Sequence, residues 1–506
     1  MDNLINAFAL VADPSVLGVI LGASIFGLFV GAIPGLSATM ATALLVPLTF
    51  FMEPLPAIAA IVSSVAMAIF AGDIPGAMLR IPGTPASAAY VDDAYQMTLR
   101  GQAERALGIG LVSSVFGGLV GAVILTTGAP FLAEFAFQFS TVEYFWLACL
   151  GLSCSVIISR GSPVKGLVAL LIGLFISTIG IDVTGGHPRF TFGSIDLMGG
   201  VSFIPAMIGM FAMTEILRFA MAKQHNTASV PKSSSSVYGG QWQMMRRNKG
   251  NLARGSLIGT VVGILPGAGS DIAAWVSYAM AKKFSRTPEK FGTGHDEGLA
   301  AAGSANNSSL SGVWIPALVF GIPGDSVTAI AIGVLFMKGI TPGPMVFATQ
   351  ADLTYAIFLT FFVANILLLF LGYFAIRGAR YVVQTPARLL MPIILLFCIV
   401  GSFAITNSVF GIAIMLVLGI IGFLMEENGF PIAPTILGIV IGPMLEDNFM
   451  ASVIKADGNI IGFFDRPVAG TLGAITVLIW TVPLISMAIR AILRRWTTAE
   501  AQDPRS

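Results

Sequence analysis

The sequence predicts an all-α membrane protein that crosses the bilayer many times, and three observations support this fold class. Only 10% of the 506 residues are charged, whereas soluble domains carry about 25%. The hydrophobic fraction is 56%. Apolar runs of about 20 residues, the length of a spanning helix, recur along the chain. These features exclude a soluble globule, a disordered chain, a nucleic-acid binder and a disulfide scaffold, and an outer-membrane barrel would instead show alternating strands.

The apolar runs mark the predicted membrane segments in order, and we expect about 10–12 transmembrane helices. Some runs are short, so kinked or partial spans are expected among them. In the first half the runs lie near 15–33, 55–71, 106–129, 141–159, 163–181 and 201–220. In the second half they lie near 351–376, 389–403, 406–425, 430–445 and 468–490.

Residues 221–250 form the one polar linker. Seven Lys/Arg residues and no acidic residue occur between Arg218 and Arg254, so the positive-inside rule predicts a cytoplasmic linker. Alternation of the spans then places the 182–200 loop outside. The basic clusters elsewhere in the chain agree with this alternation.

Four apolar stretches are interrupted and do not fit simple spans. Residues 15–51 break at Pro34-Gly35 and residues 252–281 at Pro266-Gly267, which predicts re-entrant helical hairpins. Residues 72–92 and 299–325 are rich in Pro, Gly, Ser and Asn, so we expect them to be broken as well. Irregular backbone at membrane depth persists only where it is buried in protein or lines a cavity.

An internal repeat relates the two halves. The Pro34-Gly35 break recurs at Pro266-Gly267, and both are preceded by a glycine three residues upstream of the proline. Ile74-Pro75 with Ile81-Pro82-Gly83 recurs as Ile315-Pro316 with Ile322-Pro323-Gly324. The topology count makes the halves inverted, a signature of secondary transporters, although ordinary kinks in a helical bundle remain the alternative. The predicted organisation is a first repeat over 1–220, the basic linker over 221–250, a second repeat over 251–445, and an extra span with a cytoplasmic tail over 446–506.

The breaks supply candidate substrate-binding residues. Glycine lets a ligand approach the backbone, and proline fixes an unwound path. Exposed amides, hydroxyls and the positive ends of half-helices favour a carboxylate, whereas local helix capping is the alternative for each residue alone. The candidates are Arg80, Gly83, Thr84, Ser87, Pro323, Gly324, Ser326, Gly267, Gly269 and Ser37.

A second group of oxygen-bearing side chains suits a sodium ion, a hard cation that prefers oxygen ligands. Asp271 either caps a helix or coordinates the cation, and Asp325 either binds a cation or a proton or serves in capping or pairing. The candidate cation-binding residues are Asn306, Asn307, Asp325, Asp271, Ser270 and Thr39.

Charges within the membrane are few, and such charges usually mark pathways or pairs. Arg80 either clamps a substrate carboxylate with its planar fork or forms an ion pair with Asp73 or Asp325. The residues suggest no catalytic set and no phosphate-cradling loop, so we expect neither an enzyme nor an ATPase. The three histidines are scattered, and the three cysteines lie in apolar runs, so a metal site and a disulfide framework are not expected.

Several motifs together give this chain a family resemblance that covers nearly its whole length. They are the stretch Pro82 to Ser87 with Gly101-Gln102-Ala103 beyond it, Arg189 to Gly193, Leu265 to Gly269, Ala305-Asn306-Asn307, and Gly321 to Gly324. With these motifs the chain resembles the large membrane subunit of the tripartite tricarboxylate transporters, the TctA family.

The resemblance implies a multi-pass permease of the bacterial inner membrane, with no cofactor and with sodium or protons as the coupling ion. The implied partners are a small four-span membrane subunit like TctB and a periplasmic solute-binding protein like TctC. The substrate would be citrate or another small carboxylate. A channel, a carrier that needs no binding protein, and a non-transporting membrane scaffold are the rival functions.

The chain departs from the family pattern at three positions. Gly303 stands where a glutamate is common, Asp325 where a serine is usual, and Arg80 where a neutral residue is usual. These departures bear on the coupling ion and on the exact substrate.

Overall fold

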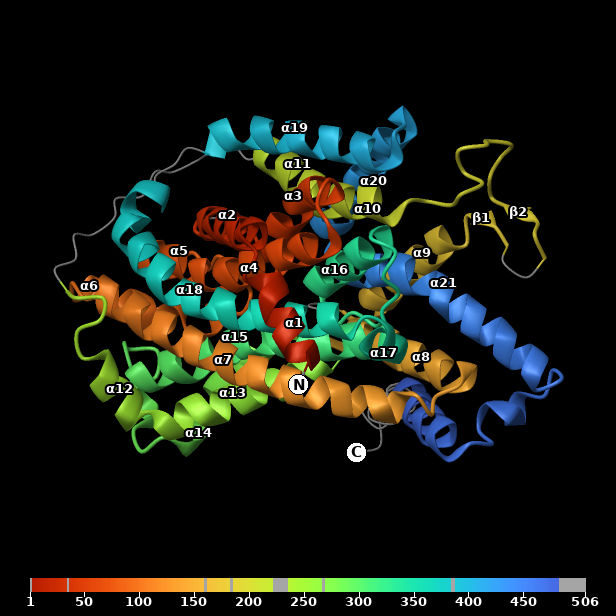
Figure 1. Ribbon diagram of the computed structural model, residues 1–506. Coiled ribbons are helices and arrows are strands. Elements are labelled where there is room, and N and C mark those ends of the chain that lie inside the picture. Colours follow the sequence, from red (N-terminus) through yellow and green to blue (C-terminus); the bar gives the residue numbers. More distant parts are fainter. Residues whose placement is uncertain are drawn as a thin grey trace, which may run out of the picture.

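The computed structural model describes residues 2–33, 36–158, 162–182, 185–221, 235–265, 269–383 and 387–481, and helices dominate it (Figure 1). The helices of the first half are α1 (Asp2–Val11), α2 (Pro14–Gly31), α3 (Ala38–Phe50), α4 (Pro54–Ala71), α5 (Asp73–Leu79), the 3₁₀ turn η1 (Ser87–Ala89), α6 (Val91–Leu99), α7 (Ala103–Ala136), α8 (Thr141–Ile158), α9 (Pro163–Ser177), α10 (Phe203–Met207), the π-helix η2 (Ile208–Met213) and α11 (Thr214–Met221).

The second half continues with the same kinds of element. They are α12 (Gln241–Arg247), α13 (Lys249–Ile264), α14 (Gly269–Phe284), η3 (Pro288–Lys290), α15 (Asp296–Phe320), α16 (Ser326–Met337), α17 (Pro344–Thr349), α18 (Ala351–Val383), α19 (Ala387–Thr406), α20 (Val409–Glu427), α21 (Ile432–Lys455) and η4 (Ile460–Phe463). A last apolar helix covers Pro467–Thr481.

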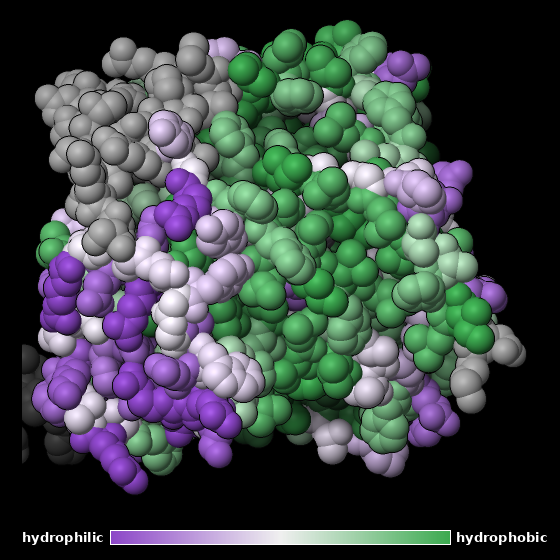
Figure 2. Space-filling view, turned by 60° about the vertical axis from the view of Figure 1, so that its left-hand side comes forward, coloured by the Kyte–Doolittle hydropathy of each residue, from purple (hydrophilic) through white to green (hydrophobic). Residues whose placement is uncertain are grey.

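The predicted fold class, an all-α polytopic membrane protein, is confirmed. Within the described residues, seven helices are long and apolar enough to cross a membrane, and six shorter apolar helices accompany them. Large apolar side chains such as Ile25, Phe374 and Val417 are exposed on α2, α18 and α20. Figure 2 shows a broad hydrophobic area flanked by hydrophilic residues on one face of the molecule, as expected for a surface that meets lipid.

Small residues let the central helices approach closely. Helices α7 and α15 run beside each other through the middle of the molecule (Figure 1), and α13 packs on α15. A Cβ atom added at Gly117 of α7 would lie 2.0 Å from the carbonyl oxygen of Ser304, and one at Gly259 of α13 would lie 2.3 Å from that of Ala305. Close backbone contact of this kind is the usual basis of helix association in membranes.

Two of the predicted breaks lie between helices, and one prediction was wrong in part. Helices α2 and α3 flank the first Pro-Gly break, and α13 and α14 flank the second; residues 34–35 and 266–268 themselves lie outside the described part of the chain. In contrast, α15 is one continuous helix from Asp296 to Phe320, so the 299–325 stretch is broken only after residue 320. Its polar residues do not interrupt the helix because Ser304, Ser308 and Ser309 bond to carbonyls of their own preceding turn.

The end of the predicted linker is folded onto the bundle. Residues 222–234 lie outside the described part of the chain, but Val237 is fully buried and α12 follows it. The Gln241 side chain donates to the carbonyl of Arg105, at 3.3 Å. Residues 235–250 are therefore part of the packed structure beside α7 rather than a free connection.

The 182–200 loop begins with a short antiparallel ribbon, in which β1 (Gly180–Ile181) leads into the loop and β2 (Pro188–Arg189) lies within it. Both guanidinium Nη atoms of Arg189 donate to Glu446 of α21, at 2.6 and 2.9 Å, and this carboxylate raises the pKa of Arg189. The loop is thus anchored to α21 by a bidentate ion pair. The three cysteines, Cys149, Cys154 and Cys398, are free.

Candidate functional site

A cavity of about 650 Å³ lies where the N-terminal ends of four helices meet. Its lining includes the start of α3 at Ser37, of α14 at Gly269, of α16 at Asp325 and of α21 at Pro431. Each helix N-terminus carries roughly half a positive elementary charge and unpaired amide groups. The four helix ends therefore contribute positive potential to the cavity, and its size is that of small-molecule sites.

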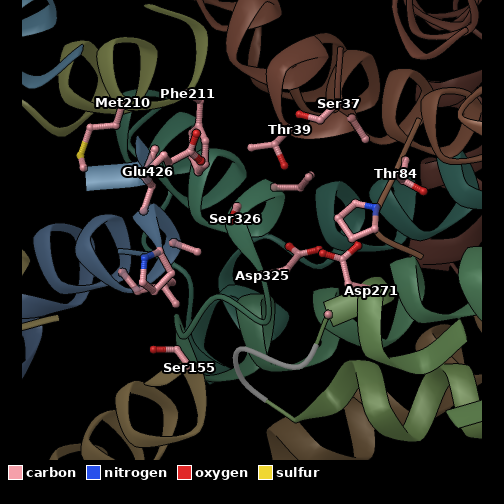
Figure 3. Close-up of a pocket in the computed structure, with 18 of the residues that line it drawn as sticks. Ser37, Thr39, Thr84, Ser155, Met210, Phe211, Asp271, Asp325, Ser326 and Glu426 are labelled. Carbon is pink, nitrogen blue, oxygen red and sulfur yellow. The ribbon is translucent and has the colours of Figure 1, made fainter. Parts of the chain in front are cut away.

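Short polar side chains from both halves of the chain face this space. The predicted residues that line the cavity are Ser37, Thr39, Thr84, Gly269, Asp271, Asn306, Asp325 and Ser326. Figure 3 shows Thr39 and Thr84 in the upper part of the view and Ser326 near the middle, with Asp325 and Asp271 below the threonines. The sequence prediction therefore brought together residues that are far apart in the chain.

Capping fixes two of the helix ends. The Ser37 hydroxyl accepts a hydrogen bond from the amide of Met40, at 3.2 Å, at the start of α3. Asp325 and Thr328 form a capping box at the start of α16, with Asp325 Oδ1 accepting from the Thr328 amide at 2.8 Å. The capping interpretation of Asp325 is therefore confirmed, and the same residue also lines the cavity.

The second hairpin approaches α16 closely at this point. Gly269 has a φ of +53°, and a Cβ atom there would lie 3.1 Å from the Cβ of Asp325. Glycine is suited to this left-handed conformation because it carries no Cβ. The contact brings the beginning of α14, with Asp271, against the beginning of α16.

A charged cluster on the opposite side of the cavity was missed in the sequence. Arg218 of α11 donates to Glu215, at 2.7 Å, and to Glu426 of α20, and all three residues line the cavity. With Asp271 and Asp325, the lining has four carboxyl groups and one guanidinium group. An anionic substrate in such a cavity requires accompanying cations.

Other missed lining residues include Met210 and Phe211 of η2 and Phe430 of the α20–α21 turn. Figure 3 shows Met210 and Phe211 beside Glu426. Their sequence signal was weak because they lie in or next to runs that read as plain membrane spans. Glu215 and Arg218 were a usable signal, since paired charges at the end of an apolar run are unusual.

The structure places Arg80 outside the cavity. Arg80 ends α5 in a left-handed conformation, with φ 59°, and its side chain is 60% exposed. Its Nη2 atom lies 2.7 Å from the Asp92 carboxylate of α6. The alternative of an ion pair with Asp73 or Asp325 is therefore wrong, and the substrate clamp has no support because Arg80 does not line the cavity.

Gly83 and Gly324 serve the packing of their own turns. A Cβ atom on Gly83 would lie 2.7 Å from the backbone of Gly72, and one on Gly324 would lie 2.7 Å from Val313 Cβ. The space beside each glycine is thus filled by the chain itself, and neither glycine lines the cavity. Pro323 lies in the same turn and does not line the cavity.

Ser87 and Asn307 are likewise held by protein groups. The Ser87 hydroxyl bonds to the backbone of Thr84, at 2.8 Å to the oxygen, as in a local capping motif. Asn307 is fully buried and donates to Ser114 of α7 and to Asn365 of α18. Neither residue lines the cavity, whereas Asn306 does.

Two further candidates cannot be placed. Gly267 and the Ser270 side chain lie outside the described part of the chain. No group of three or more His, Cys, Asp or Glu residues suited to a metal ion occurs among the described residues.

Comparison with known proteins identifies the family. The model of the tripartite tricarboxylate transporter TctA family matches residues 17–437. An uncharacterised 52.8 kDa protein in the TAR-I ttuC' 3' region of Agrobacterium vitis is 34% identical over 464 residues, which are 91% of each chain.

A second uncharacterised protein of the same organism, in the TAR-II ttuC' 3' region, is 35% identical over 230 residues, which are 45% of this chain and 95% of that protein. No solved structure matches. Because the family model covers most of the chain and the first relative matches it almost end to end, this multi-pass membrane protein belongs to the tripartite tricarboxylate transporter TctA family, as its motifs predicted.

Proposed function

We propose that the chain is the permease subunit of a binding-protein-dependent secondary transporter that imports a small acid with two or three carboxyl groups. One observation carries this proposal: the N-terminal ends of four helices, from both halves of the chain, converge on one cavity. Hydroxyls of Thr39, Thr84 and Ser326 add donors for a carboxylate. A carboxylate at membrane depth needs such matched donors, since desolvation is costly.

The acidic lining supports coupling to a cation gradient. Asp271, Asp325, Glu215 and Glu426 share the cavity with a single arginine, Arg218. A polycarboxylate would be repelled by these groups unless protons or sodium ions entered with it. In this proposal Asp325 and Asn306 are candidate ligands for cations that enter the cavity with the substrate.

Two inverted repeats moving against each other would expose the cavity alternately to either side of the membrane. The succession of elements supports this arrangement. The pair α2 and α3, the buried helix α4 with α5, and the 34-residue α7 correspond in order to the pair α13 and α14, the buried α15, and the 33-residue α18. In this proposal residues 221–250 are cytoplasmic and the 182–200 loop is periplasmic.

The family supports partners like TctB and TctC and a place in the bacterial inner membrane. The test is uptake of labelled citrate and other di- and tricarboxylates by cells that express the chain with its membrane partner, with and without the binding protein. We expect uptake only when the binding protein is present. Uptake without it would support an independent carrier or a channel instead.

Matched variants connect uptake to the cavity. Thr39→Val removes a lining hydroxyl, and Thr360→Val removes a hydroxyl that bonds only within α18. A hydrogen bond to a charged group contributes about 1.5–3 kcal/mol, or roughly 10- to 150-fold in affinity. We expect Thr39→Val to raise the half-saturating substrate concentration by a factor that approaches this range, and Thr360→Val to leave it unchanged. Equal effects of the two variants would show that the substrate does not bind in this cavity.

A further inference from the structure

The carboxyl group of Asp73 is buried behind the cavity wall, and Tyr90 links it to the lining residue Asn306. Asp73 begins α5 and is 6% exposed. Its Oδ1 atom accepts a hydrogen bond from the Tyr90 hydroxyl, at 2.6 Å, while its Oδ2 atom has no partner in the described structure. The Tyr90 hydroxyl in turn accepts from the amide of Asn306, at 3.3 Å, and Asn306 lines the cavity.

The surroundings of Asp73 fit a proton better than a metal cation. Asp73 faces a separate space of about 10 Å³, roughly the size needed for one water molecule. A Cβ atom at Gly110, which borders this space, would lie 3.3 Å from Asp73 Oδ2. Besides Asp73 and Tyr90 the lining has one polar residue, Ser87, and the rest is apolar or glycine. Such a space cannot supply the oxygen ligands that a sodium ion requires.

The charged groups of α6 and of the start of α7, which pack against α5, are engaged elsewhere. On α6, Asp92 pairs with Arg80 of α5, and Asp93 bonds to Tyr278 and to backbone amides. At the start of α7, Glu104 pairs with Arg377 of α18 and Arg105 with Asp296. None of them borders the space that Asp73 faces, and its lining includes no basic side chain among the residues that the structure describes.

We propose that Asp73 is the proton-binding group that couples this permease to a pH gradient, and that Tyr90 and Asn306 report its state to the substrate cavity. An unpaired carboxylate is strongly disfavoured in so apolar a site, so the group takes up a proton when it is closed off from water. It releases the proton where the conformational change opens it to water. The proposal rests on the transport function proposed above and names its coupling ion.

The hydrogen-bond direction explains how the cavity would sense the proton. A charged carboxylate only accepts, so Tyr90 must donate to Asp73 and is left to accept from Asn306. A protonated Asp73 can donate to Tyr90, which frees the hydroxyl proton for Asn306. Protonation of Asp73 therefore determines whether the oxygen or the NH2 group of the Asn306 side chain faces the cavity.

The second half of the chain lacks an equivalent group. Asp73 directly precedes the Ile-Pro pair of the repeated motif, and Trp314 holds that place before Ile315-Pro316. The indole nitrogen of Trp314 is buried without a partner in the described structure. The repeat therefore supplies one proton site of this kind rather than two.

The test separates coupling from transport in vesicles that contain the chain with its partner subunits. Asp73→Asn keeps the shape of the protonated acid, and Asp92→Asn is the control because Asp92 is 52% exposed and paired with Arg80. Two readouts are taken: exchange of labelled for unlabelled carboxylate without a gradient, and accumulation driven by an imposed pH gradient. We expect Asp73→Asn to retain exchange and lose pH-driven accumulation, and Asp92→Asn to retain both.

Two outcomes would overturn the inference, and both differ from failure of the proposed function. Asp73→Asn accumulating substrate with the wild-type response to pH would exclude Asp73 as the coupling group. If Asp73→Asn lost exchange as well, pH-difference infrared spectra of the wild-type chain would decide, because a carboxyl band that titrates must vanish in Asp73→Asn. Its persistence would refute the proposal. Wild-type vesicles that carried no carboxylate in either mode would instead refute the transport function.

Discussion

The residues that line the cavity were predictable from the sequence where a small polar side chain follows a break in the backbone. Thr39, Thr84 and Ser326 line the cavity because each stands just after a predicted interruption. Arg80 was not predictable in the same way, since its direction depends on a left-handed residue at the end of α5. Glu215 was missed because it lies inside an apolar run that was read as a span.

Asn306 and Asn307 show why neighbouring residues of one type separate in role. Successive helix residues point about 100° apart, so Asn306 faces the cavity and Asn307 faces α7 and α18. Asn307→Ala would leave the buried Ser114 carbonyl and Asn365 oxygen without this donor, at a cost of about 1–3 kcal/mol. We expect a lower melting temperature of the purified protein.

Asn306→Ala is the matched control for this experiment, because it truncates the same side chain one residue away. We expect it to alter the dependence of uptake on substrate or ion while lowering the melting temperature less. A wild-type melting temperature in Asn307→Ala would contradict the structural role assigned to that residue.

At the scale of elements, hydropathy located the seven long apolar helices but not short ones such as α1, α6 and α16, nor the state of each interruption. The 299–325 stretch appeared broken because its Ser and Asn residues are poor helix formers, yet α15 is continuous. Burial against glycines of α7 and α13 outweighs this weak local preference, and such tertiary contacts are not visible in the sequence. Capping of α16 by Asp325 was, by comparison, one of the alternatives that the sequence offered, and Thr328 completes it as a capping box.

The start of α16 allows capping and charge to be tested apart. Asp325→Asn keeps a side-chain oxygen for the Thr328 amide and removes the charge, whereas Asp325→Ala removes both. An N-cap contributes about 0.5–2 kcal/mol, so we expect Asp325→Ala to lower the melting temperature and Asp325→Asn to preserve it. If Asp325 also binds the coupling cation, both variants will weaken the ion dependence of uptake; an unchanged ion response in both would leave capping as its only role.

At the scale of the whole molecule, the two halves are joined by buried polar contacts as well as by apolar packing. Asp93 of α6 is fully buried, and its Oδ1 atom accepts from the amides of Gly292, Gly294 and His295 at 2.8–2.9 Å. Its Oδ2 atom accepts from the Tyr278 hydroxyl of α14, at 2.7 Å. A side chain of the first half thereby organises the loop that leads into α15, a contact that neither half's sequence reveals.

This junction gives a prediction that concerns the assembly of the halves. Asp93→Ala would leave three amides and one hydroxyl without their acceptor, each at a cost of about 1–3 kcal/mol when buried, so it should lower the melting temperature strongly. Tyr278→Phe should lower it less. Because both changes remove the same hydrogen bond, the double variant should lower the melting temperature by less than the sum of the two single decreases. Tyr373→Phe, on the distant α18, is the control and should add to Asp93→Ala without such coupling; full additivity of Asp93→Ala with Tyr278→Phe would show that the halves are held together elsewhere.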